Sequence, residues 1–461
     1  MKYFSTRGQV KGLSFQDAVL MGLADDGGLL IPETLPSFTE RDLKHFAEIE
    51  YDRLAYEIMQ NFVDDILDKD FTEIVMKTYA AQNFDDPRII RIVKPGKVKI
   101  AELFHGPTFA FKDMALQFLG NLFEYILKKR NQKMNILGAT SGDTGSAAIY
   151  GVKGKENINM FMLYPYGRIS NVQELQMTTV QDKNIYCIAA KGSFDDCQNV
   201  VKTIFSDLSF KRKYNLGAVN SINWARILAQ IVYYFYIYTR SVKHIGDTIN
   251  IVVPTGNFGN IFAGFLARTM GLPIKPVLAT NRNNILTRAV KFGDYSIERL
   301  RPSHSPAMDI QVASNFERYL YYLYKSTDKV SDAMDNFRIN REIELRGQYL
   351  GQIQRDFIAA DATDENIEYE IRTMYNLHEY IIDPHTACAV YAANKMEIAT
   401  EDTICLATAH PAKFPEVIKD CLGFNPEAPK ALQNMESLPQ RNYKMMADAK
   451  EVKEFIEETL G

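Results

Sequence analysis

The chain has 461 residues, of which 46% are hydrophobic and 24% charged, the composition of a folded globular protein rather than a disordered one. This length exceeds what one hydrophobic core usually serves, so we expect two or three packed units. The formal net charge of -4 provides no basic surface for nucleic acid or anionic lipid, and neither is an expected partner.

Cysteine usage and hydropathy indicate a cytoplasmic location. The five cysteines are an odd number without a CxxC pair, which favours a reducing compartment and argues against disulfides or structural zinc. The start, MKYFSTRGQVKG, lacks the apolar core of a signal peptide. The most apolar stretch, residues 227–238, contains Gln230 and is shorter than the roughly 20 residues of a membrane span. We therefore expect a buried helix there and no association with a membrane.

Residues 1–97 predict a mostly helical N-terminal domain after an irregular opening. TERDLKHFAEIE and DRLAYEIMQNFVDD carry apolar residues at helical spacing. Between the opening and these helices, segment 25–36 (DDGGLLIPETLP) is rich in turn residues, and we expect a surface loop there.

Residues 98–461 predict an α/β core, because short apolar runs alternate with helical patterns. The runs are KVKIAELF, MNILGAT, NINMFMLYP, NIYCIAA, TINIVVPT, IKPVLAT and TICLATA. Such alternation favours largely parallel sheets covered on both faces, and two sheets fit the length. We expect a smaller α/β subdomain over about residues 134–225, a larger one from the remainder, and a helical insertion over about residues 281–376.

A lysine stands at the start of the first long helix of this core. The block ELFHGPTFAFKD places Lys112 before a helix that Asp113 caps. Most lysines at helix starts are solvated, but the apolar residues at 109–111 and 114 would dehydrate this one. A dehydrated lysine has a lowered pKa and a nucleophilic amine. It also follows a strand and a Gly-Pro turn, where an α/β sheet opens its ligand crevice.

Two strand–loop–helix segments contain glycine-rich turns. MNILGAT runs into SGDTG at residues 141–145, and INIVVPT runs into GNFGN at residues 256–260. In this arrangement backbone N–H groups and the positive end of the helix can bind an anion. For either loop alone, an ordinary turn between strand and helix is the simpler interpretation. Neither matches GxGxxG or a GK[ST] P-loop, so we expect no dinucleotide or ATP site. Together they suggest cradles for one phosphate and one carboxylate, or for two phosphates.

Two further segments place polar side chains at strand ends. In AVNSINWARIL, Arg226 could clamp a phosphate, with Asn220 and Ser221 as additional donors. In TICLATAHPAKF, Thr408 could bond a ring nitrogen. Taken singly, a solvated arginine after a helix cap and a threonine bonded to its own backbone are the simpler interpretations.

The sequence contains no motif typical of a metal site or of a serine hydrolase. The seven histidines show no HExxH or other ligand spacing, so we expect no metal, and the chain contains no GxSxG elbow. His105 and His410 are candidate acid–base groups, but a single histidine is more often structural.

The blocks described above, taken together, resemble the threonine synthase family of pyridoxal-phosphate enzymes, in its longer bacterial and fungal branch. The resemblance rests on ELFHGPTFAFKD, ATSGDTGSAA, NSIN followed by Arg226, PTGNFGN and TAHPAKF, in this order. FSTRG, DGGLLIPE, LYPYGRIS and SPAMDIQVASNFER extend it from residue 1 past residue 420. Each block is shared loosely with other enzymes of the tryptophan-synthase-β-like class, whereas the set is specific.

The resemblance implies a tryptophan-synthase-β-like fold with two parallel-sheet subdomains and a helical N-terminal domain. It implies pyridoxal 5'-phosphate as cofactor and a lyase that converts O-phospho-L-homoserine and water into L-threonine and phosphate. The reaction would proceed by γ-elimination and β-addition, as the last step of threonine biosynthesis.

The resemblance also implies roles for individual residues. Lys112 would be the Schiff-base lysine and the mobile acid–base group. The cofactor would be held by Asp143 beside its phenolic oxygen, Thr408 at its ring nitrogen, and the phosphate cradle Gly256, Asn257, Phe258, Gly259 and Asn260. The substrate would be held at its carboxylate by Thr140, Ser141, Gly142, Asp143 and Thr144, and at its phosphate by Asn220, Ser221 and Arg226 with Thr144. Shorter related enzymes carry Asn in place of Asp143, so an anion there would need a proton or a donor.

Two other functions are open at the level of sequence. A threonine-synthase-like phospho-lyase would release 2-oxobutyrate, ammonia and phosphate instead of threonine. A non-catalytic protein could keep the fold to bind a phosphorylated metabolite or a partner, but an intact Lys112 together with both glycine loops argues against it. The oligomeric state, monomer or homodimer, is also open.

Overall fold

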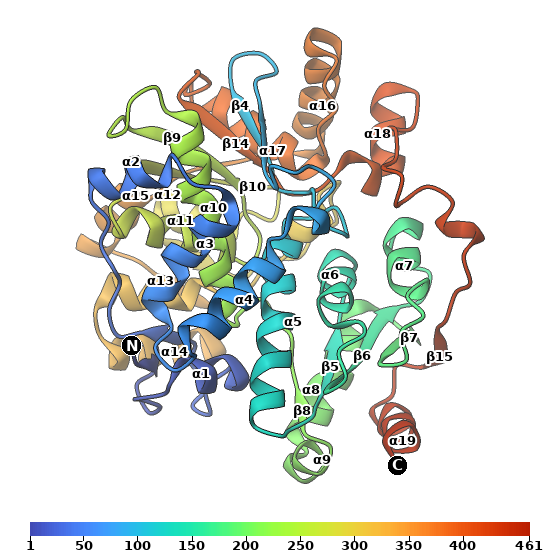
Figure 1. The fold of residues 1–461 in the computed structure, drawn as a ribbon. Coiled ribbons are helices and arrows are strands. Elements are labelled where there is room, and N and C mark those ends of the chain that lie inside the picture. The colour runs from blue at the N-terminus through green and yellow to red at the C-terminus, as the bar shows by residue number, and fades with distance from the viewer. The chain divides into compact units, whose positions relative to one another are not determined.

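The computed structural model describes residues 1–461, and contacts between them divide the chain into two units (Figure 1). Unit 1 comprises Met1–Gly106 and Ser221–Pro426, and unit 2 comprises Pro107–Asn220 and Glu427–Gly461. Two of the crossings between units fall inside the HGP and NSIN sequence blocks.

A six-stranded sheet of order β13-β10-β9-β14-β4-β3 forms the centre of unit 1. All neighbouring strands are parallel except β3 and β4. The strands are β3 (Arg91–Val93), β4 (Lys99–Glu102), β9 (Ile249–Pro254), β10 (Ile274–Thr280), β13 (Ile358–Asp361) and β14 (Thr403–Ala407). The central strands β9 and β14 are almost entirely buried, as expected for strands covered on both faces.

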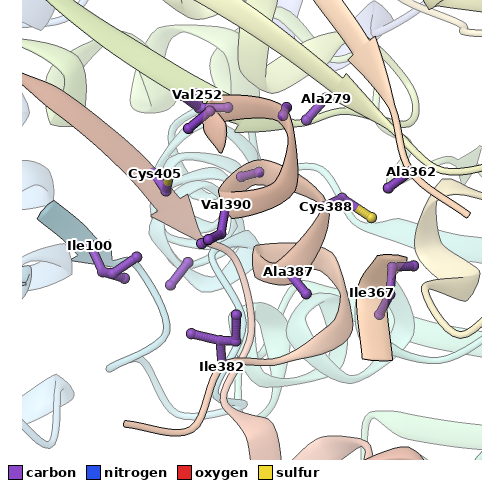
Figure 2. Close-up of a cluster of buried hydrophobic side chains, with 14 of the residues drawn as sticks. Ile100, Val252, Ala279, Ala362, Ile367, Ile382, Ala387, Cys388, Val390 and Cys405 are labelled. Atoms are coloured by element: carbon purple, nitrogen blue, oxygen red, sulfur yellow. The ribbon is translucent and has the colours of Figure 1, made fainter. Parts of the chain in front are cut away.

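Helix α17 (Pro384–Lys395) packs against this sheet. Figure 2 shows its Ala387, Cys388 and Val390 in one buried cluster with Val252 of β9 and Cys405 of β14. The helix begins after buried Asp383, whose side chain accepts hydrogen bonds from the first backbone N–H groups.

Two long helices of unit 1, α10 (Trp224–Ser241) and α11 (Gly259–Thr269), pack against each other. Residues 227–238 of α10 are all buried, which confirms the predicted buried helix. None of the helices combines the length and apolar character that crossing a membrane requires.

The N-terminal part of unit 1 contains four helices and a two-stranded antiparallel sheet of β1 (Tyr3–Ser5) and β2 (Leu30–Pro32). The helices are α1 (Phe15–Met21), α2 (Glu40–Phe46), α3 (Tyr51–Met59) and α4 (Asp68–Thr78). The prediction of a surface loop over residues 25–36 is wrong for its middle, residues 28–32, because Leu30 and Ile31 are fully buried in β2. Pairing with β1 satisfies the backbone and covers these apolar side chains.

The tract 281–376 is mostly helical, as its pattern predicts. It contains α12 (Ile285–Phe292), α13 (Phe316–Tyr324), α14 (Thr327–Asn340), α15 (Gln348–Asp356), α16 (Asp364–His378), and the small strands β11 (Asp294–Ser296) and β12 (Glu342–Glu344). It also contains β13, which the sequence did not predict and which joins the main sheet beside β10. Helix α18 (Pro415–Leu422) follows β14. The domain ranges expected from the sequence stay predictions.

A five-stranded parallel sheet of order β15-β7-β6-β5-β8 forms the centre of unit 2. Its strands are β5 (Met134–Ala139), β6 (Ile158–Pro165), β7 (Ile185–Lys191), β8 (Leu216–Gly217) and β15 (Tyr443–Met446). Its helices are α5 (Lys112–Lys129), α6 (Asp143–Val152), α7 (Asn171–Thr178), α8 (Phe194–Ser206), α9 (Leu208–Lys213) and α19 (Ala449–Leu460). The expected fold class, α/β with two largely parallel sheets, is confirmed.

Candidate active site

Lys112 is the first residue of α5 in unit 2, and its side chain is only 13% exposed. Its Nζ lies 3.6 Å from Oδ2 of Asp143 and 5.8 Å from the centre of the Phe111 ring. The amine is thus largely removed from water and lies beside a carboxylate.

The turn before α5 is closed by Asp113, although not in the way the sequence suggested. The helix has Phe111 at its N-cap, so the prediction that Asp113 caps it is wrong. The buried carboxylate of Asp113 instead accepts hydrogen bonds from the backbone N–H and the hydroxyl of Thr108, at 2.8 and 2.7 Å. Asp113 therefore fixes the path of the chain immediately before Lys112.

The SGDTG loop connects β5 to the N-terminus of α6. The hydroxyl of Thr140 accepts hydrogen bonds from the N–H groups of Gly142 and Gly145, at 3.0 and 2.9 Å, and so shapes the loop from within. Gly142 has φ +140°, and a Cβ there would lie about 2.4 Å from the amide of Gln173. Ser141 is exposed. The loop lies against the positive end of a ten-residue helix, the position at which anions bind.

Asp143 opens α6, and its carboxylate forms an ion pair through one oxygen and accepts a hydrogen bond through the other. Oδ2 faces Lys112, and Nε2 of Gln173 donates a hydrogen bond to Oδ1 at 2.9 Å. This cation and this amide donor meet the need of an anion at this position. Gln173 was not predicted as a site residue, because a glutamine within a helix is normally solvated. Its place just after the LYPYGRIS block was the only indication of a role.

The GNFGN loop connects β9 to α11 in unit 1. Phe258 adopts a left-handed conformation with φ +64°, and its buried ring packs against the rings of Phe316 and Phe357. A Cβ on Gly256 would lie 2.7 Å from the carbonyl oxygen of Ala307, so only glycine fits there. Gly259 then begins α11.

Asn260 and Thr408 complete this edge of the large sheet. Asn260 is buried, and its Oδ1 accepts hydrogen bonds from the hydroxyls of Tyr233 and Tyr234 at 2.5 and 2.8 Å, whereas its Nδ2 has no partner. Thr408 follows the neighbouring parallel strand β14 and is 6% exposed. The carboxyl ends of neighbouring parallel strands meet at one sheet edge, where α/β proteins bind ligands.

Arg226, in the first turn of α10, is a buried cation without an anion. Its side chain has no hydrogen-bond partner at Nε or Nη1, and burial lowers its pKa to about 10. The interpretation of a solvated arginine is therefore wrong. An unpaired buried guanidinium is unfavourable unless a ligand supplies the negative charge, and its planar donors match phosphate.

Two of the remaining predicted residues, Asn220 and Ser221, flank the NSIN crossing. Asn220 ends the first segment of unit 2 and Ser221 begins the second segment of unit 1. The hydroxyl of Ser221 lies 2.9 Å from that of Ser314, a residue to which the sequence assigned no role. Thr144 follows Asp143 in the first turn of α6.

Comparison with known proteins gives one consistent answer. Residues 2–79 match the model of the threonine synthase N terminus, residues 101–408 that of pyridoxal-phosphate-dependent enzymes, and residues 386–456 that of the threonine synthase C-terminal region. A threonine synthase from Eremothecium gossypii is 43% identical, with 99% of this chain and 98% of that protein covered. The chain belongs to the threonine synthase family.

Solved structures agree with this assignment to the threonine synthase family. A crystal structure of PLP-bound threonine synthase from Brucella melitensis has a TM-score of 0.96 at 38% identity and covers 100% of this chain and 99% of that one. Threonine synthase from yeast has a TM-score of 0.94 at 40% identity, with 100% and 98% covered. The chain is therefore a pyridoxal-phosphate-dependent lyase of this family.

The residues present fit pyridoxal phosphate. Lys112 provides a largely buried amine, Asn260 a buried amide donor without a partner, and the glycine loop before it a turn too tight at Gly256 for any side chain. These features suit a phosphorylated aldehyde.

Two histidines near the ends of β4 and β14 have opposite electrostatic surroundings. Burial opposes a charge on His105, but its ring bonds Asp85 at 2.6 Å and Glu102 at 2.9 Å, and these contacts raise its pKa to about 9. Burial lowers the pKa of His410 to about 4, and its Nδ1 accepts a hydrogen bond from the N–H of Ala412. His105 is thus cationic and His410 neutral near pH 7.

Proposed function

We propose that the chain converts O-phospho-L-homoserine and water into L-threonine and phosphate, by γ-elimination followed by β-addition, as the last step of threonine biosynthesis. The observation that carries this proposal is Arg226, a buried guanidinium with unpaired donors in a member of the threonine synthase family. Such a group selects a substrate with a dianionic phosphate over one without it.

Pyridoxal phosphate, when bound, supplies an electron sink for charge that develops on substrate carbons. Lys112 is its covalent attachment point and, once free, moves protons to and from successive carbons of the substrate. Asp143, which lies 3.6 Å from the Lys112 amine and accepts a hydrogen bond from Gln173, would lie beside the phenolic oxygen. The cofactor phosphate would be held by Gly256, Asn257, Phe258, Gly259 and Asn260, and the ring nitrogen by the neutral hydroxyl of Thr408.

The substrate is held through its two anionic groups. Thr140, Ser141, Gly142, Asp143 and Thr144 bind the carboxylate, chiefly through loop N–H groups other than that of Gly142, because the hydroxyl of Thr140 and the N–H of Gly142 bond each other inside the loop. Asn220, Ser221, Arg226 and Thr144 bind the phosphate. Arg226 stabilises the charge on the departing phosphate, which stays bound and acts as base for the attacking water.

The setting that we propose is that of a small-molecule enzyme in the cytoplasm, as a monomer or homodimer and without a nucleic-acid partner. Sparse, unpaired cysteines support this location.

Product analysis tests the reaction. Purified protein supplied with pyridoxal phosphate and O-phospho-L-homoserine should release threonine and phosphate in equal amounts, measured by chromatography and a phosphate assay. Formation of 2-oxobutyrate and ammonia without threonine would establish the phospho-lyase instead.

Lys112→Ala tests the role of the amine in the same assay. Turnover should fall by at least about a thousandfold, since the variant lacks both the attachment point and the proton carrier. The thermal unfolding midpoint of the cofactor-free protein should change little. Lys128→Ala, an exposed position at the other end of α5, is the control and should keep full activity. Substantial turnover by Lys112→Ala would rule out the proposed role.

A further inference from the structure

The segment that precedes α13 joins the two loops that we assign to the phosphates of cofactor and substrate. The hydroxyl of Ser314 lies 2.9 Å from that of Ser221 and donates a hydrogen bond to Oδ1 of Asn257 at 3.3 Å. One hydroxyl therefore links a side chain of the substrate-phosphate loop to a side chain of the cofactor-phosphate loop.

The next residue, Asn315, is fully buried and joins the backbones of the same loops. Its Nδ2 donates hydrogen bonds to the carbonyl oxygens of Ser221 and Asn257, both at 3.1 Å. Its own backbone N–H donates to the carbonyl oxygen of Asn257, also at 3.1 Å. A single planar amide thus holds two segments that are far apart in the sequence at a fixed separation.

Arg318 holds this amide from behind. It is fully buried, and its Nη1 donates a hydrogen bond to Oδ1 of Asn315 at 2.6 Å. Its remaining donors bond the carbonyl oxygens of Ile222 and Leu30. Because Arg318 can only donate, Oδ1 of Asn315 must face it, and the NH2 group must face the two loops.

We propose that Asn315 is a positioning residue that sets the spacing between the cofactor-phosphate and substrate-phosphate loops. The inference rests on the proposed function for the roles of those loops. A displacement of about 1 Å can cost on the order of a hundredfold in rate, so an amide that fixes both loops influences binding of both phosphates. The proposed reaction gives no role to the block SPAMDIQVASNFER, and the spacing of the two loops gives it one.

The test compares Asn315→Ala and Ser314→Ala with Asn184→Ala. Asn184 lies in unit 2, outside both loops, and its Nδ2 likewise donates only to backbone carbonyls, those of Val152, Lys155 and Ile158. Loss of its bonds should lower stability without moving either loop. Three quantities are measured: the Kd of pyridoxal phosphate by absorbance titration, the KM for O-phospho-L-homoserine, and the unfolding midpoint.

Asn315→Ala should raise both the Kd and the KM about tenfold, the equivalent of about 1.4 kcal/mol each. Ser314→Ala, which loses one hydroxyl and keeps the backbone bridge, should raise both about threefold. Asn184→Ala should change neither by more than about twofold. If Asn315→Ala fails to fold, the Kd and the KM of Ser314→Ala test the proposal.

Equal Kd and KM values in the loop-bridging variants and in Asn184→Ala would overturn the proposal. So would a change in one constant only, because the residue would then serve a single loop. If the parent protein makes no threonine, the proposed function fails, whereas the titration with pyridoxal phosphate still tests whether Asn315 supports its loop.

Discussion

At the scale of single residues, the two buried arginines of unit 1 show how a binding site differs from a structural bond. Burial lowers the pKa of both, to about 10 for Arg226 and about 9 for Arg318. Arg318 donates to carbonyl and amide oxygens from Nε, Nη1 and Nη2, whereas Nε and Nη1 of Arg226 have no acceptor. The first cation stabilises the fold, and the second destabilises it until an anion binds.

Replacing each arginine by methionine should therefore change stability in opposite directions. Arg226→Met should raise the free energy of unfolding by about 1–3 kcal/mol in phosphate-free buffer, because it removes an unpaired buried charge. Arg318→Met should lower it by about 2–4 kcal/mol, because it leaves buried acceptors unsatisfied. Urea unfolding measures both, and the KM of Arg226→Met should rise by roughly a hundredfold. A loss of stability in Arg226→Met as large as in Arg318→Met would mean that Arg226 is paired without substrate.

Some site residues could be predicted from their neighbours in the sequence, whereas others have roles that depend on partners far away in the chain. Lys112 and Arg226 belong to short blocks that follow strands, so their positions are visible in the sequence. Gln173 acts on Asp143 from 30 positions away, and Asn315 acts on Ser221 from 94 positions away. Nothing beside them in the sequence specifies these partners, because folding alone creates the contacts. Polar residues that organise a site are for this reason harder to predict than those that bear its chemistry.

At the scale of helices and strands, prediction succeeded where apolar runs were long. All seven predicted strands exist, since each carries a continuous run of buried residues. Two of the strands that were not predicted, β13 and β15, contain four residues each and mix buried with partly or fully exposed positions. β15 pairs with β7 although more than 250 positions separate them in the chain. Short strands of this kind are stabilised by tertiary pairing rather than by local preference.

The contact between α5 and α6 determines how the two site residues at their N-termini meet. A Cβ on Gly120 would lie 1.9 Å from the carbonyl oxygen of Gly151, and a Cβ on Gly151 would lie 2.4 Å from that of Leu116. The helices therefore touch backbone to backbone, an approach that only glycine permits. Because Lys112 begins α5 and Asp143 begins α6, this contact supports their 3.6 Å separation.

Gly120→Ala should accordingly separate the two helices. The unfolding free energy should fall by about 1–3 kcal/mol from overpacking, and threonine formation should fall about tenfold or more as Lys112 shifts. Gly351→Ala in α15 is the matched control, because a Cβ there meets only the flexible end of Arg355 at 3.4 Å. That variant should keep full activity and become slightly more stable, by up to about 1 kcal/mol. Equal behaviour of the two variants in calorimetry and assay would show that the helices adjust.

At the scale of the whole molecule, three buried titratable groups of unit 1 make stability depend on pH. Glu102 is buried, which alone would raise its pKa, but donors on His105, Arg91 and Tyr380 lower it to about 2. The pKa of His105 is raised to about 9 and that of His410 is lowered to about 4. Each shift ties the free energy of unfolding to a defined pH interval.

The expected profile has its maximum near pH 6.5. The stabilisation by cationic His105 is complete below its unfolded pKa of 6.5 and is lost as the pH rises towards about 9. On the acid side, buried neutral His410 costs stability as the pH falls from 6.5 towards about 4, and the contribution of Glu102 is lost below 4.5.

His105→Gln should therefore flatten the alkaline decline of the unfolding midpoint, which should amount to several degrees, and leave the acid decline intact. His410→Gln should do the reverse between pH 4 and 6.5. Calorimetry of the cofactor-free protein at constant ionic strength separates the two, and a His105→Gln curve parallel to the parent curve above pH 6.5 would show that His105 is not held as a cation.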